Sequence, residues 1–84
     1  MRVVLRRHAL DQIAERGLDP AWVERAALHP DWSEPDPQPG VACHYGSVPE
    51  FGGRVLRVVV ADRGDERHVL TVDFNRGAAH RRRP

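Results

Sequence analysis

The sequence contains no lysine, only one cysteine and no long run of apolar residues. A transmembrane helix needs about 20 consecutive apolar residues, so we expect no membrane-spanning segment. Cys43 has no partner for an internal disulfide, which suits a reducing compartment. No apolar signal core follows the N-terminal arginines, and we therefore expect a cytoplasmic protein with no membrane partner.

Metal-binding patterns are also missing. Neither HExxH nor CxxC nor a paired-carboxylate motif occurs in the chain. The histidines outside the N-terminal segment show no ligand spacing: His29, His44, His68 and His80. The sequence therefore predicts no metal site and no other cofactor.

The length and the charge balance narrow the class of protein further. A chain of 84 residues has room for one domain, which we place at residues 1–78, with a basic tail at 79–84. The three tail arginines contribute three positive charges to a formal net charge of +1, so residues 1–80 carry −2. This balance argues against broad nucleic-acid binding but leaves room for a small local site.

Two consecutive helices are predicted near the N-terminus. Residues 7–16 place Leu10, Ile13 and Ala14 at helical spacing, which predicts an apolar stripe. Gly17 suits the left-handed position just past a helix end. Asp19 then serves as the N-cap of a second helix that stops before a proline at position 30.

The rest of the chain favours a sheet. Residues 30–40, with four prolines, are expected to form an ordered surface loop or else a flexible linker. Strands are expected at 2–6, 41–48, 53–61 and 67–75. We therefore predict an α+β fold: an N-terminal helix hairpin packed on a three- to four-stranded, mostly antiparallel sheet.

The last two strands form a hairpin around the sequence RGDE. Alternation assigns one face to the core, with an odd-length turn centred on Gly64 holding the register. The predicted core set is Leu56, Val58, Val60, Leu70, Val72 and Phe74. The other face then carries Arg57 across from Thr71 and diagonal to Asp73.

Arg57 is the least ordinary charge in the chain, because it lies mid-strand between valines. It either forms a structural pair with Asp73 or neutralises a phosphate or a developing oxyanion. Tyr45, on the preceding strand, is either a hydroxyl donor or half-buried packing. His8 begins a helix, where it either acts as a general base or faces water. His8 and Arg16 are separated by about 12 Å of helical rise, so they can line one groove without touching the same atom.

The segments HALDQIAERGLDPAWVERAAL (8–28), GGRVLRVVV (52–60) and HVLTVDF (68–74) resemble the bacterial DUF4258 family, a domain of unknown function. The resemblance implies a relation to RelE-like and BrnT-like toxins, which are small metal-independent ribonucleases with a RelE/barnase-like fold. The positions that it implies are His8, Arg16, Arg57 and Thr71. The implied partners are RNA and a cognate antitoxin or immunity protein.

On this basis we expect a metal-independent ribonuclease of a bacterial toxin system. His8 is the expected base, Arg57 the charge stabiliser and Tyr45 or Thr71 the helper. RNA would be held by three arginines: Arg16, Arg54 and Arg76. The alternative is a non-catalytic protein-binding module or an inactive toxin relative, and convergence of His8 with Arg57 would discriminate the two.

Overall fold

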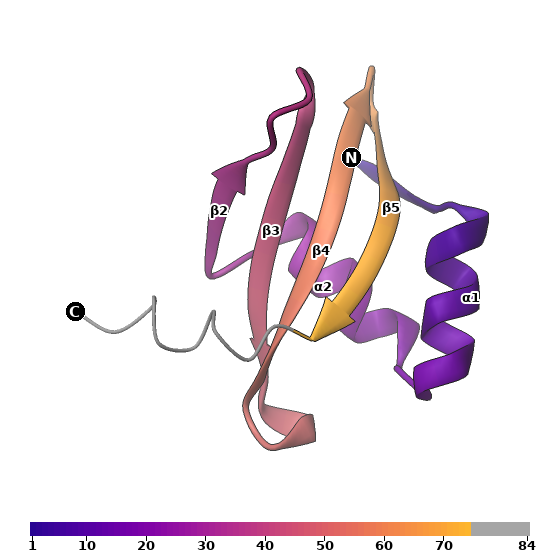
Figure 1. Cartoon of the computed structure of the whole chain (residues 1–84), viewed down its shortest axis with the longest axis vertical. Helices are drawn as coiled ribbons and strands as arrows, with labels where there is room; N and C mark the ends of the chain where they lie inside the picture. The colour runs from indigo at the N-terminus through magenta and orange to yellow at the C-terminus, as the bar shows by residue number, and fades with distance from the viewer. Residues whose placement is uncertain (75–84) are drawn as a thin grey trace.

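The computed structural model describes residues 1–74 (Figure 1). Arg76 and the predicted tail at 79–84 lie outside these residues. No helix in the described part is long and apolar enough to cross a bilayer. In chain order the elements are β1 (Arg2–Leu5), α1 (Arg7–Arg16), α2 (Pro20–Leu28), β2 (Trp32–Pro35), β3 (Val41–Val48), the 3-10 helix η1 (Pro49–Phe51), β4 (Arg54–Arg63) and β5 (Glu66–Phe74).

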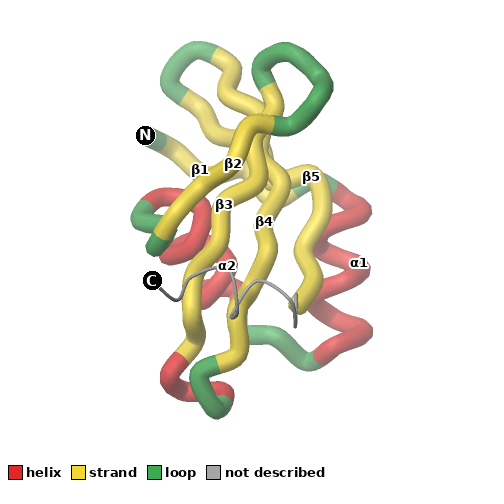
Figure 2. Tube along the Cα trace, turned by 60° about the vertical axis from the view of Figure 1, so that its left-hand side comes forward, coloured by secondary structure: helices red, strands yellow, loops and turns green. Residues whose placement is uncertain are grey.

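The strands form one five-stranded sheet in the order β1-β5-β4-β3-β2. β1 runs parallel to β5, and the other neighbours are antiparallel. Both helices pack on one face of this sheet (Figure 2). The predicted α+β class is confirmed, but the sheet has more strands than the three to four expected. The segment expected to be a loop at 30–40 contains β2, a short edge strand, where a proline such as Pro35 is tolerated.

The helix hairpin follows its predicted local signals. α1 occupies the predicted residues 7–16 and ends at Gly17, whose φ of 63° lies in the left-handed region. The Asp19 side chain accepts a hydrogen bond from the backbone N–H of Ala21 at 2.9 Å, so it is the N-cap of α2. These signals were readable because each capping contact spans only a few residues.

The apolar stripe of α1 differs from the prediction. Leu10 is 48% exposed and Ala14 is also exposed, whereas Ala9 and Ile13 are buried. The buried pair is spaced four residues apart and faces β5, the strand that α1 contacts most. Ala9, with no exposed surface, allows the helix to approach the sheet closely.

The β4–β5 hairpin reaches its register by another route than predicted. Arg63 pairs with Glu66, so the turn has two residues and begins with Gly64 at a φ of 62°. A β-bulge follows, because Val60 pairs with Val69 while Val59 pairs with Thr71. This bulge leaves Leu70 as the extra residue of β5.

The bulge decides which side chains enter the core. Leu70 was expected in the core but packs with the cluster on the opposite face, and Val69 is buried in the core instead. The bulge also sets Arg57 directly across from Asp73, not from Thr71 as predicted. The assignment of Leu56, Val58 and Val72 to the core, with Arg57 and Thr71 sharing the other face, is confirmed.

The two faces of the sheet are covered differently. On the helix side, Gly46 of β3 lies close to α2, since a Cβ atom there would be 3.2 Å from the Cβ of Ala26. On the far face, which no helix of residues 1–74 covers (Figure 2), the strand side chains bury a smaller cluster. Its buried members are Cys43, Tyr45, Val55 and Val59.

Candidate functional site

A group of polar side chains lies on the far face of the sheet. We call it the far-face cluster, and its members are Cys43, Tyr45, Arg57, Thr71 and Asp73. They come from three adjacent strands, β3, β4 and β5, and share this face because side chains alternate along each strand. Three of the predicted site residues, Tyr45, Arg57 and Thr71, are therefore brought together.

Arg57 is the charged centre of the far-face cluster. Its Nη1 donates to Asp73 Oδ2 at 3.2 Å, and its Nη2 contacts Cys43 Sγ at 3.5 Å. Burial alone lowers the pKa of Arg57, but Cys43, Tyr45 and Asp73 oppose it and raise the pKa overall. The guanidinium therefore stays charged, and part of its five-donor fork makes no strong hydrogen bond.

Tyr45 is enclosed within the far-face cluster. Its side chain is only 3% exposed, and its ring stacks on Trp32 at 4.9 Å between centroids, with 9° between the planes. Burial raises the pKa of Tyr45, and the neighbouring Glu34 adds to the increase while Arg57 opposes it. The phenol is therefore protonated at neutral pH and is able to donate a proton.

His8 and Arg16 lie on α1, and both are exposed. Between them, Gln12 extends to the edge of the sheet, where its Oε1 accepts a hydrogen bond from the backbone N–H of Val72 at 2.7 Å. Because residues four apart occupy one face of a helix, His8, Gln12 and Arg16 form a stripe, which we call the edge stripe. The edge stripe runs along β5 beyond Val69, the last residue of β5 that pairs with β1.

A second contact fixes the direction of the edge stripe. The backbone N–H of Arg6 donates to the carbonyl of Val69 at 3.1 Å. From Arg6 to Gln12 a helix rises about 9 Å, and from Val69 to Val72 a strand extends about 10 Å, so α1 and β5 run side by side. By this spacing His8 is level with Leu70 and the adjoining Thr71.

His8 and Arg57 nevertheless approach from different sides. α1 packs on the helix side and along the β5 edge, while Arg57 projects from the far face of β4. No hydrogen bond joins the two residues in the part of the chain that the structure describes. They border the same strand without converging on one point.

Arg54 lies at the start of β4, away from the far-face cluster. Its guanidinium carbon lies 5.2 Å from the ring centre of Phe51 and 6.0 Å from that of Phe74. The two rings stack on each other, with centroids 5.2 Å apart. Arg54 is thus an exposed cation held on an aromatic surface.

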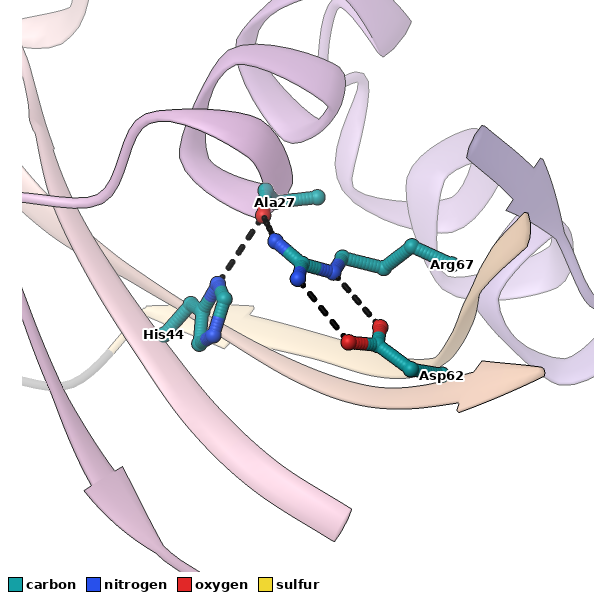
Figure 3. A network of polar contacts seen from close by, with 4 residues as sticks. All are labelled: Ala27, His44, Asp62 and Arg67. Atoms are coloured by element: carbon teal, nitrogen blue, oxygen red, sulfur yellow. Dashed lines mark hydrogen bonds and ion pairs between the residues drawn. The ribbon is translucent and has the colours of Figure 1, made fainter. Parts of the chain in front are cut away.

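Sequence reasoning missed a second polar cluster on the helix side (Figure 3). The carbonyl of Ala27, in the last turn of α2, accepts hydrogen bonds from His44 Nδ1 at 2.9 Å and Arg67 Nη1 at 2.8 Å. Arg67 also binds Asp62 through two hydrogen bonds, of 2.7 and 3.0 Å. The signal available was alternation, since His44 shares the inward phase of β3 with Ala42.

The fold and the site together define a small α+β domain with an arginine–tyrosine cluster on the sheet face that its helices leave free. The chain belongs to the DUF4258 family, a domain of unknown function whose family model matches residues 5–73. The resemblance noted from the sequence is thereby confirmed at the level of the family. No curated protein and no solved structure matches the chain.

Proposed function

We propose that this domain is a metal-independent ribonuclease related to RelE-like and BrnT-like toxins, acting along the edge of β5. The observation that carries the proposal is the hydrogen bond from Val72 N–H to Gln12. It lays the edge stripe beside the strand that carries Thr71 and Asp73, so that His8 and the far-face cluster border one segment of β5.

In the proposed reaction, an RNA strand lies over this edge. His8 withdraws the proton of a 2′-hydroxyl, and that oxygen attacks the adjacent phosphorus. Arg57 stabilises the charge that gathers on the phosphate oxygens, which requires the bound RNA to bring one phosphate within reach of both His8 and Arg57, since the two side chains do not converge in the free chain. Tyr45 or Thr71 supplies the proton to the leaving oxygen, and Arg16, Arg54 and Arg76 hold flanking nucleotides.

The state of Arg57 is compatible with this role. Its ion pair with Asp73 is a single contact of 3.2 Å, and its remaining neighbours are neutral: the Cys43 sulfur atom, a weak acceptor, and the Tyr45 phenol. A phosphate offers the planar fork two oxygens at once, which a neighbouring carboxylate in this geometry does not. Arg57 therefore has unused capacity to bind a phosphate.

The test of the proposal is cleavage of cellular RNA by the purified chain, with and without ribosomes, and growth arrest on induction in bacteria. His8→Ala is expected to abolish both effects while leaving the melting temperature unchanged, because His8 is exposed. His29→Ala, at the exposed end of α2, is the matched control and should retain them. A wild-type chain that cleaves no RNA under either condition would overturn the proposal.

We further propose that a cognate antitoxin or immunity protein binds the active chain. A cell that makes a ribonuclease able to arrest its growth needs such a partner in order to grow. Co-expression of the adjacent gene product is expected to restore growth and to co-purify with the chain. Growth arrest that no co-expressed neighbour relieves would contradict this part of the proposal.

A specific observation favours a second candidate, a non-catalytic protein-binding module. His8 does not converge with Arg57, and Arg57 already has a carboxylate partner in Asp73. Arg57→Lys discriminates the two, since lysine keeps the charge but loses the planar fork. A ribonuclease loses most of its cleavage at an unchanged melting temperature, whereas a binding module has no cleavage to lose.

A further inference from the structure

The helix side of the sheet carries a cavity that the proposed ribonuclease does not use. α2 ends at Leu28. Within residues 1–74 no helix covers the corner of the sheet near the ends of β2, β3 and β4 (Figure 1). The cavity there has a volume of about 250 Å³. Its lining residues are Pro35, Gly40, Val41, Ala42, His44, Val60 and Asp62.

His44 is the most enclosed polar residue of this cavity, being only 9% exposed. Its Nδ1 faces the Ala27 carbonyl at 2.9 Å, and because a carbonyl only accepts, Nδ1 must carry the hydrogen (Figure 3). In a neutral imidazole the other nitrogen, Nε2, is then an acceptor. The fold thus fixes one tautomer of the ring.

His44 lines the cavity. Its hydrogen bond to the Ala27 carbonyl uses Nδ1, which leaves Nε2 as the acceptor that the ring can offer. Burial lowers the pKa of His44, and Arg67 lowers it further, against the opposing bond to Ala27. The ring is therefore a neutral acceptor at physiological pH.

Asp62 supplies a second acceptor beside it. Each of its carboxylate oxygens accepts one hydrogen bond from Arg67, and each oxygen has a further lone pair. Arg67 holds the pKa of Asp62 below its ordinary value, so the group remains a carboxylate. The cavity thus combines two fixed acceptors, on β3 and β4, with aliphatic walls.

We propose that this cavity binds the guanidinium side chain of an arginine presented by a partner polypeptide. The walls of Val41, Ala42 and Val60 suit the aliphatic stem, and a planar fork is able to reach two separate acceptors. The volume is below the range of about 300–1,000 Å³ typical of whole small-molecule ligands, and it suits a single side chain. The proposal does not depend on ribonuclease activity.

The choice of an organic cation over a metal follows from the ligand count. A structural metal site needs about four protein ligands, and a catalytic one about three. No group of three or more histidine, cysteine or acidic residues in residues 1–74 could hold an ion. His44 and Asp62 are enough for a forked donor but too few for a metal centre.

The experiment uses the full chain and N-acetyl-arginine methylamide as the probe, followed by nitrogen-15 NMR of the histidine side chains. We expect a saturable shift of His44 Nε2. The norleucine analogue should give none, and the lysine analogue should bind more weakly. Equal binding of the norleucine or lysine analogue, or no saturable shift with arginine, would overturn the proposal.

His44→Asn is the decisive variant, because the asparagine amide keeps a donor near Ala27 and removes the Nε2 acceptor. It should weaken arginine binding about tenfold, the effect of one lost hydrogen bond to a charged group. His29→Asn is the control and should bind normally. If His44→Asn does not fold, Ala42→Leu fills the cavity and leaves both acceptors in place. Unchanged affinity in either folded variant would overturn the proposal.

Discussion

The β4–β5 hairpin contains two arginine–aspartate pairs that differ in what else each arginine does. Arg57 and Asp73 face each other near the open end of the hairpin, and Asp62 and Arg67 face each other near its turn. Arg67 binds Asp62 in a fork and also the Ala27 carbonyl, so each of its three side-chain nitrogens donates a hydrogen bond, and its side chain is 18% exposed. Arg57 makes one 3.2 Å contact with its carboxylate, and its side chain is 30% exposed.

The difference lies in what the strand pairing leaves for each arginine to bind. Arg67 lies on the helix side, where the end of α2 offers a carbonyl within reach. Arg57 lies on the far face, where its further neighbours are the sulfur of Cys43 and the phenol of Tyr45. The Asp62–Arg67 pair near the turn therefore has a structural role, because it also binds the end of α2. In the Arg57–Asp73 pair near the open end, the arginine keeps donors that make no strong hydrogen bond.

The largest effect is expected from Arg67→Ala. The substitution removes three hydrogen bonds and leaves the buried end of α2 short of a donor. We expect a loss of about 2 kcal/mol in the free energy of unfolding, or about 10 °C in melting temperature for a domain of this size. Calorimetry against Arg63→Ala, an exposed arginine of the same hairpin, checks this. Equal melting temperatures for the two variants would remove the distinction between the pairs.

A smaller effect on stability, and a larger one on RNA, is expected from Asp73→Asn. The amide keeps the shape of the side chain and removes the charge that competes with phosphate for Arg57. Stability should fall by less than about 1 kcal/mol, as is typical of partly exposed pairs. Affinity for single-stranded RNA, measured by fluorescence anisotropy, should rise severalfold. Weaker RNA binding in this variant would show that Asp73 orients Arg57 for the ligand.

The stability of the domain should depend on pH through His44, which shares the Ala27 carbonyl with Arg67 on the helix side. Burial, and secondarily Arg67, lowers the folded-state pKa of His44 from 6.5, so the unfolded chain takes up a proton first. Stability is then full above about pH 6.5 and declines as the pH falls from there toward the folded-state pKa. Urea unfolding between pH 7.5 and 5 measures the slope, which His44→Asn should flatten. An unchanged slope in that variant would assign the dependence to another histidine.

The smallest effect is expected at a third arginine–carboxylate pair, Arg25 and Glu50. The contacts are two hydrogen bonds of 3.0 Å, and hydrogen bonding to Arg25 lowers the pKa of Glu50 to about 2. Both side chains are nevertheless about half exposed, so water and salt replace most of the interaction. Glu50→Gln should leave the melting temperature unchanged at neutral pH in physiological salt. A drop as large as that of Arg67→Ala would mean that contact geometry outweighs burial here.

Local signals account for what the sequence could predict of the fold. Gly17 and Asp19 cap the two helices through contacts with residues a few positions away, so the helix hairpin could be predicted from the local sequence. Alternation correctly grouped Arg57 and Thr71 on one face, because it needs only the phase of each strand. β2 was missed because an edge strand needs pairing on one side only, and the segment 30–40 that contains it has four prolines.

The parts that sequence reasoning missed depend on distant contacts. The hydrogen bond between Gln12 and Val72 joins residues 60 apart in the sequence, and that between Arg67 and Ala27 joins residues 40 apart. The residues around each partner give no indication of which distant residue it will contact. Alternation predicts a phase but contains no information about where the phase changes. The bulge could therefore be located only once the pairing of β4 with β5 was known.

The extra residue of β5 has a consequence for how the chain can change in length. Leu70 has no paired residue on β4, because it lies between Val69, which pairs with Val60, and Thr71, which pairs with Val59. Because the two-residue turn already closes the strands, deleting Leu70 would leave Val69 facing the helices and Thr71 facing away, each on its present side. A shortened descendant of this gene could therefore lose that codon and keep Arg57 opposite Asp73. Deleting one of the residues 66–68 would instead turn part of β5 over, so the bulge is where the hairpin tolerates a change of length.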